Sequence, residues 1–127
     1  MNGHRPPSSD TVALVRAQGA YNLVTGVWPL VSMRSFEAVL GPKRDRWLVR
    51  TVGGLLVVVG LTQLSTPRDD AALRQARRLG MGAAATFLAV DVVYVAAGRL
   101  RWTYLLDAAA EAGWLIAWRR SRGRAAP

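Results

Sequence analysis

The charged residues of this 127-residue chain are confined to a few short stretches, and this segregation limits its possible folds more than any other feature. Residues 17–33, 51–67, 79–98 and 102–118 include only three of the 25 charged side chains, although together they make up 71 residues. An even distribution would place about 14 charges there. Because an ionised side chain at the centre of a bilayer costs roughly 2.5–3.5 kcal/mol, this segregation is typical of membrane helices.

The four apolar windows predict an all-α fold, a bundle of four transmembrane helices. With the residues that continue each pattern, the spans cover about residues 12–33, 47–66, 79–98 and 102–118, within one membrane domain of residues 12–118. Residues 1–11 form a polar leader, and residues 119–127 form a basic tail. The amphipathic segment Ser35 to Leu40 predicts a short interfacial helix between the first two spans. Thr66 and Pro67 predict the start of the helix that includes the third span.

Composition excludes several classes of site. The chain has no cysteine, so it has no disulfide, thiolate metal site or cysteine nucleophile. The single histidine, His4, lies in the polar leader, which argues against haem ligation and a histidine base. We therefore predict no catalytic residue, metal or cofactor, and an enzyme is not indicated. The net charge of +9 comes from arginines that flank the spans, which points to a bilayer and not to nucleic acid.

The distribution of lysine and arginine predicts the orientation. Ten basic residues lie on the side of the two termini and the 66–78 connection, against seven on the opposite side. The positive-inside rule then predicts that both termini lie in the cytoplasm, with the chain as a multi-pass membrane protein. Tryptophan positions fit these boundaries, because Trp28, Trp47 and Trp102 fall near one predicted interface and Trp118 near the other.

A small polar set inside the predicted spans is the candidate site. It consists of Asp91, Asp107 and Glu111, together with Arg50 and Asn22 at similar depths. Polar groups left alone in lipid are unfavourable, so these side chains are expected to gather in the interior. Two interpretations are open. In the first, the acids hold the helices together: Arg50 pairs with Asp107 or Asp91, while Glu111 stays protonated or forms a hydrogen bond with Gln18 or Asn22. In the second, an acid, Glu111 above all, binds a proton, a cation or a polar headgroup.

The glycines of the second span have a simpler interpretation. Gly53 and Gly60 are seven residues apart and lie on nearly one face of a helix. We expect them to allow close packing against a neighbouring helix.

The stretch from Gly19 to Gly53 carries a resemblance. It contains a Trp-Pro pair followed by GPKRDRWLVRTVG, and it resembles a family of small, uncharacterised bacterial membrane proteins with four transmembrane helices. The segments DVVYV and YLLDAAAEAG are similar to the remaining helices of that family. In architecture the chain is also similar to the DoxX-like proteins, although no redox motif accompanies this likeness. Small multidrug transporters have a similar length and span number, but their functional glutamate lies in the first span, which has no acid here.

These observations predict a small integral membrane protein with a structural or accessory role, and the resemblance implies that it lies in the bacterial cytoplasmic membrane. Its expected partners are the lipid bilayer and either further copies of itself or another membrane protein. Two alternatives remain open, an ion-coupled transporter that uses the intramembrane acids and a lipid- or quinone-binding protein.

Overall fold

The structure is a computed structural model that describes residues 9–125, with side chains described for residues 9–121. The described chain folds into five helices and short connections. They are α1 (Ser9–Val31), α2 (Met33–Leu40), α3 (Arg46–Leu64), α4 (Asp70–Ala96) and α5 (Tyr104–Ala125). The prediction of an all-α fold is therefore confirmed.

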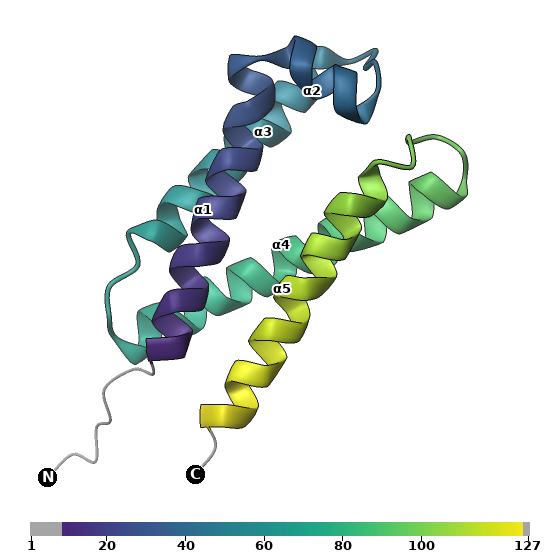
Figure 1. Ribbon diagram of the computed structural model, residues 1–127. Coiled ribbons are helices and arrows are strands. Elements are labelled where there is room, and N and C mark those ends of the chain that lie inside the picture. Colours follow the sequence, from purple (N-terminus) through teal and green to yellow (C-terminus); the bar gives the residue numbers. More distant parts are fainter. Residues whose placement is uncertain (1–8, 126–127) are drawn as a thin grey trace, which may run out of the picture.

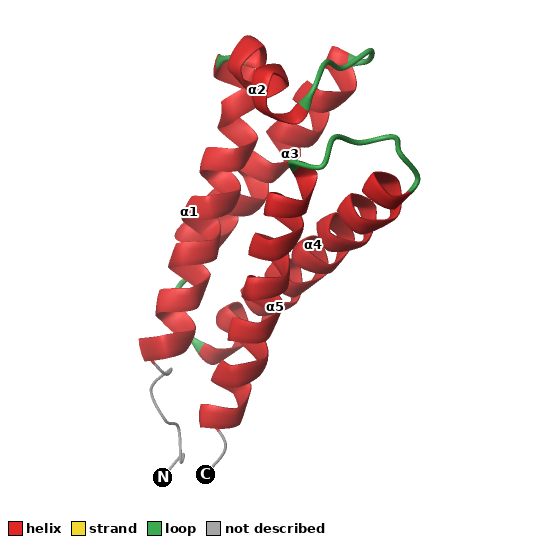
Figure 2. Ribbon diagram, turned by 45° about the vertical axis from the view of Figure 1, so that its right-hand side comes forward, coloured by secondary structure: helices red, strands yellow, loops and turns green. Residues whose placement is uncertain are grey.

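The helices form two antiparallel pairs. Figure 1 shows α1 beside α3, with α2 across their upper end, and α5 beside α4. The start of α1 and the end of α5 lie at the same end of the molecule as the α3–α4 connection (Figure 1). Figure 2 shows that α4 runs diagonally away from α3 after this connection. Contact between the two pairs is therefore much smaller than contact within each pair.

The prediction of four transmembrane helices is wrong for this structure. Within residues 9–125, two helices, α3 and α4, are long and apolar enough to cross a membrane, with mean hydropathies of 1.6 and 1.8. The other two long helices carry too many polar groups. Arg16, Gln18 and Asn22 interrupt α1, while α5 contains two acids and ends in arginines. Low charge over 17 residues does not make a helix apolar when amides and hydroxyls interrupt it or charges lie at its end.

Glycines bring α1 and α3 into backbone contact. Gly19 and Gly26 on α1 face Gly60 and Gly53 on α3, and each pair of glycines is seven residues apart. A Cβ atom at Gly60 would lie 2.6 Å from the backbone nitrogen of Leu23 and 2.7 Å from the carbonyl oxygen of Gly19. Only glycine leaves room for such an approach. The prediction that Gly53 and Gly60 allow close packing is confirmed.

The two helix pairs are joined by a small apolar core near the α3–α4 connection. It consists of Val12 and Val15 from α1, Leu73 and Ala76 from α4, and Trp118 from α5. Trp118 is fully buried, so its predicted place at a lipid interface is wrong. Its ring joins helices that are distant in sequence, because α5 returns along α4 to the start of α1.

The helix ends follow local capping rules, with one departure from expectation. Ser32 caps α2, where its hydroxyl accepts a hydrogen bond from the Ser35 amide. The fourth helix begins at Asp70, after the predicted start at Thr66 and Pro67. Asp69 is the N-cap, since its carboxylate accepts a hydrogen bond of 2.9 Å from the Ala72 amide. This charge-assisted cap is stronger than the hydroxyl of Thr66, which instead donates to the Thr62 carbonyl oxygen.

Arg16 satisfies the C-terminal end of α3. Its guanidinium donates to the carbonyl oxygen of Gln63 at 2.8 Å and to that of Thr66 at 2.7 Å. These carbonyl oxygens lie at the negative end of the helix dipole, where a cation is favourable. The arginine that makes α1 too polar for a membrane span therefore ties α1 to the end of α3.

Replacing Arg16 with glutamine is expected to destabilise the fold by about 1.5 kcal/mol, because two charge-assisted hydrogen bonds are lost. Amide hydrogen exchange should accelerate in the last turn of α3 and remain unchanged in α5. The control is Arg78→Gln, since Arg78 is exposed on α4. Equal stability losses in both variants would show that the loss of a positive charge, and not the loss of the Arg16 hydrogen bonds to the end of α3, destabilises the fold.

Candidate functional site

A chain of buried amides connects α1, α3, α4 and α5 just above the apolar core. Asn22 donates to the Gln63 Oε1 atom at 2.8 Å, and Gln63 donates to the Gln18 Oε1 atom at 3.1 Å. Gln18 Oε1 also accepts from the Trp118 indole nitrogen at 2.8 Å, and the Gln18 amide donates to the Gly80 carbonyl oxygen at 2.9 Å. Gln18 and Gln63 are both 0% exposed. We call Asn22, Gln63, Gln18 and Trp118 the amide network.

The amide network satisfies its own polar groups. Buried amides are stable when their donors and acceptors are paired, and this network pairs them across four helices. Gly80 has no side chain to interfere, because a Cβ atom there would overlap Gln18. Asn22 thus belongs to a structural network and is not bonded to the acids, among the hydrogen bonds of residues 9–121.

The three intramembrane acids of the sequence prediction do come together. Asp91 on α4 and Glu111 on α5 are 2% and 3% exposed, and Asp107 on α5 is half-buried. Asp91 and Asp107 are hydrogen-bonding neighbours, and the charge of Glu111 acts on Asp91. Asp107 and Glu111 share one helix face because they are four residues apart. We call Asp91, Asp107 and Glu111 the acidic cluster.

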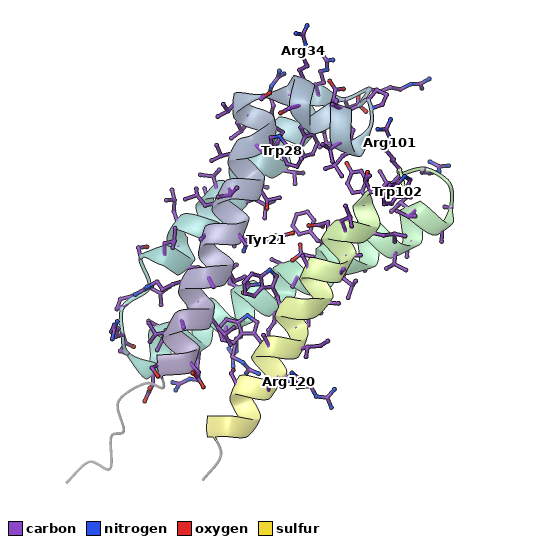
Figure 3. All side chains as sticks on the ribbon, in the orientation of Figure 1. Tyr21, Trp28, Arg34, Arg101, Trp102 and Arg120 are labelled. Atoms are coloured by element: carbon purple, nitrogen blue, oxygen red, sulfur yellow. The ribbon has the colours of Figure 1, made fainter. Side chains whose placement is uncertain are left out.

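Tyrosines lie beside the acidic cluster. The Tyr21 hydroxyl on α1 donates a hydrogen bond of 2.6 Å to Asp107 Oδ1. Figure 3 shows Tyr21 extending from α1 toward α5. Its ring also packs on Trp114, with ring centroids 5.8 Å apart. Tyr104, at the start of α5, is close enough for the charges of Asp91 and Asp107 to act on it.

The predicted pairing of Arg50 with an acid is not found. Arg50 is exposed on α3, and among residues 9–121 no ion pair links it to Asp91 or Asp107. The reason is the arrangement of the helices: α3 packs on α1, while the acids lie between α4 and α5. Glu111 likewise makes no hydrogen bond to Gln18 or Asn22 in the described part of the chain, since both amides bond within the amide network.

Tyr21 was not among the predicted site residues, although a signal for it exists. Gln18, Tyr21, Asn22 and Thr25 follow the spacing i, i+3, i+4, i+7, which marks one face of a helix. On this polar face of α1, Gln18 and Asn22 belong to the amide network, and Tyr21 donates a hydrogen bond to Asp107. Gln63 has no comparable signal, because it stands alone near the end of an apolar helix.

The end of α2 and the α2–α3 loop contact the α4–α5 connection and the start of α5 at the upper end of the molecule. Arg101 donates to the Ala38 carbonyl oxygen at 3.1 Å, and Thr103 donates to that of Val39 at 2.8 Å. The ammonium of Lys43 lies 4.5 Å from the centre of the Tyr104 ring. Figure 3 shows Arg101 at this end of the molecule, beside Trp102. Partial burial, followed by the nearby charge of Arg101, lowers the pKa of Lys43.

Glu37 organises the same loop. Its carboxylate accepts a hydrogen bond of 2.7 Å from the Lys43 amide and pairs with the Arg46 guanidinium at 2.7 Å. These contacts, the amide first, lower the pKa of Glu37. A lowered pKa means that the ionised carboxylate stabilises the folded loop above the ordinary carboxyl pKa. This contribution is lost as the pH falls through the lowered value.

We expect the Lys43 amide to report this titration in nuclear magnetic resonance spectra. Its proton signal should move upfield as the pH falls, with a midpoint below that of an unperturbed glutamate. In Glu37→Gln the signal should stay constant, and exchange protection of the amide should no longer depend on pH in the acidic range. A titration midpoint equal to that of an unperturbed glutamate would contradict the hydrogen bond from the Lys43 amide to Glu37.

An open pocket lies between α1 and α5 at the end that carries the start of α1. It has a volume of about 460 Å³, and Ala13, Ala17, Gly113, Ala117 and Arg120 are among its lining residues. None of the three acids lines this pocket. Among residues 9–125, no three acidic or histidine side chains are arranged to hold a metal ion. The acidic cluster therefore lies between packed helices and is separate from the open pocket.

The chain matches no protein-family model, no curated protein and no solved structure.

Proposed function

We propose that this chain is a small integral membrane protein with a structural or accessory role, held in the bilayer by α3 and α4. One observation carries the proposal: the most apolar 18-residue windows of these helices are only 22% and 17% buried. The core helix of a soluble protein buries most of such a window, so these helices need another apolar environment.

The exposed apolar side chains on α3 and α4 support this location. They form outward surfaces for which water is a poor solvent. These residues are Leu48, Val52, Leu55, Val58 and Leu61 on α3, and Leu79, Val90, Val92, Val93 and Tyr94 on α4.

The basic end of the molecule supports an orientation with the α3–α4 connection in the cytoplasm. The connection and the first turns of α4 carry Arg68, Arg74, Arg77 and Arg78. The positive-inside rule places such a segment on the cytoplasmic side. The start of α1 and the end of α5 would share that side (Figure 1). The resemblance to small bacterial membrane proteins makes the bacterial cytoplasmic membrane the proposed location.

Fractionation of cell membranes tests the proposal. The protein should stay in the pellet after a carbonate wash, and Leu55→Arg should reduce the inserted fraction. An arginine at a lipid-facing position costs roughly 2.5–3.5 kcal/mol, whereas an exposed residue of a soluble protein changes stability by about 0.5 kcal/mol or less. Leu55→Ile is the matched control. Release of the wild-type protein by carbonate, or indifference to Leu55→Arg, would overturn the membrane proposal.

An ion-coupled carrier is a second candidate, favoured by the acidic cluster. Asp91 and Glu111 are buried beside Asp107, and no cationic side chain of residues 9–121 forms an ion pair with them. A carrier requires such a protonatable site within the membrane. In reconstituted vesicles, Glu111→Gln should abolish pH-dependent flux while the protein still folds. If the protein instead has an accessory role, no flux should occur at any pH. Substitutions on the exposed apolar surfaces of α3 and α4 should then abolish binding to its partner.

A further inference from the structure

One atom of the acidic cluster lacks the partner that its burial requires. Asp91 is 2% exposed, and its Oδ2 atom has no hydrogen-bond partner. A buried carboxylate oxygen without a donor is costly, since it loses its hydration and gains nothing in return. Asp107 is the hydrogen-bonding neighbour of this carboxyl group, but a second carboxylate offers only acceptors.

A proton between the two carboxyl groups resolves this conflict. If Asp91 is protonated, its hydroxyl becomes a donor and Asp107 becomes the acceptor. The Asp107 Oδ1 atom also accepts a hydrogen bond of 2.6 Å from the Tyr21 hydroxyl. The two acids thus have different surroundings. Asp91 has a buried oxygen atom without a donor, whereas Asp107 is half-buried and has a strong donor.

Among residues 9–121, the charged groups that act on Asp91 include no cation. Tyr21 faces the pair from α1, while Tyr104 and Glu111 face it from α5. The charges that act on Asp91 are those of Asp107 and Glu111, both negative. No charged side chain of α3 acts on Asp91, and Arg50 of that helix is exposed. Three adjacent negative charges repel each other, and binding one proton reduces them to two.

We propose that Asp91 and Asp107 form a proton-binding site that holds one shared proton at neutral pH, carried on Asp91 and donated to Asp107. The proton comes from water and returns to water, so no bond other than O–H forms or breaks. Tyr21 is a positioning residue, because its hydroxyl donates a hydrogen bond to Asp107 Oδ1. This proton-binding site is expected for both proposed functions. An accessory protein would hold the same proton as a carrier.

Infrared spectroscopy of the purified full-length protein in detergent tests the site directly. A protonated carboxyl group has a C=O stretching band that an ionised carboxylate lacks. Aspartate labelled with heavy carbon in its side-chain carboxyl group shifts this band and leaves that of Glu111 unchanged. We expect a label-sensitive band at neutral pH in the wild-type protein, lost in Asp91→Asn and kept in the control Asp45→Asn. Asp45 is an exposed aspartate whose side chain makes no capping hydrogen bond.

Each outcome decides the proposal. A wild-type band that does not respond to the label places any proton on Glu111 and overturns the inference. A label-sensitive band that survives in Asp91→Asn also overturns it, because another aspartate then carries the proton. If Asp91→Asn fails to fold, Tyr21→Phe replaces it. The frequency of the band should then change, since the acceptor of the shared proton, Asp107, loses its hydrogen bond from Tyr21. An unchanged frequency would overturn the shared pair.

Discussion

Replacing Gly60 with leucine destabilises the fold by roughly 3 kcal/mol, the expected cost of forcing a large side chain into a fully packed contact. The Cβ atom alone would lie 2.6 Å from the Leu23 nitrogen, 2.7 Å from the Gly19 oxygen and 2.9 Å from the Leu23 Cα. All three are backbone atoms, so no side-chain rotation relieves the overlap. The helices α1 and α3 must separate, which weakens the most extensive contact of the molecule.

A neighbouring glycine supplies the control. Gly54 lies in the same helix, but a Cβ atom there meets nothing within 4 Å. Gly54→Leu should therefore be neutral or slightly stabilising, because leucine has a higher helix propensity than glycine. Thermal denaturation of both variants in detergent, followed by circular dichroism, measures the difference. Equal melting temperatures for the two variants would contradict the close approach of α1 and α3.

Replacing Gln18 with leucine is expected to cost roughly 2–4 kcal/mol, because it leaves two buried donors without an acceptor. The Trp118 indole nitrogen and the Gln63 amide both donate to Gln18 Oε1. Leucine fills a similar volume, so the loss comes from hydrogen bonding and not from a cavity. The effect should be cooperative, since Asn22 bonds to the same Gln63 side chain.

The control for Gln18 is Gln75→Leu on the exposed face of α4, which should change stability by about 0.5 kcal/mol or less. Denaturation in detergent again gives the stabilities. In addition, the indole proton of Trp118 should move upfield in nuclear magnetic resonance spectra of Gln18→Leu. An unchanged indole signal would mean that the amide network is not formed as described.

The candidate site was predictable in part. Burial of Asp91 and Glu111, and partial burial of Asp107, follow from the placement of these acids among apolar residues, where a lipid-facing position is unfavourable. Their partners did not follow, because a partner depends on which helices are neighbours. Arg50 has a suitable depth but lies on α3, and the tyrosine that bonds Asp107 comes from α1.

The number of membrane helices shows the limit of a charge-based prediction. Charge segregation correctly indicates long helices, but charge alone does not measure hydropathy. Gln18, Asn22 and Tyr21 are uncharged, and they make α1 a polar partner for its neighbours. Two helices, α3 and α4, remain apolar enough to span within the described residues.

The sequence by itself determined the local features: an all-helical chain, the glycines that permit close packing, and the acids that are withdrawn from the surface. These depend on composition and on spacings within one helix, which neighbouring residues establish without the rest of the chain. Only the tertiary structure decided that α1 pairs with α3, that Trp118 is buried, and that Asp91 meets Asp107 and Glu111 between α4 and α5. The physical reason is that packing joins residues up to 100 positions apart, as in the bond from Trp118 to Gln18, and no spacing along one helix encodes that distance.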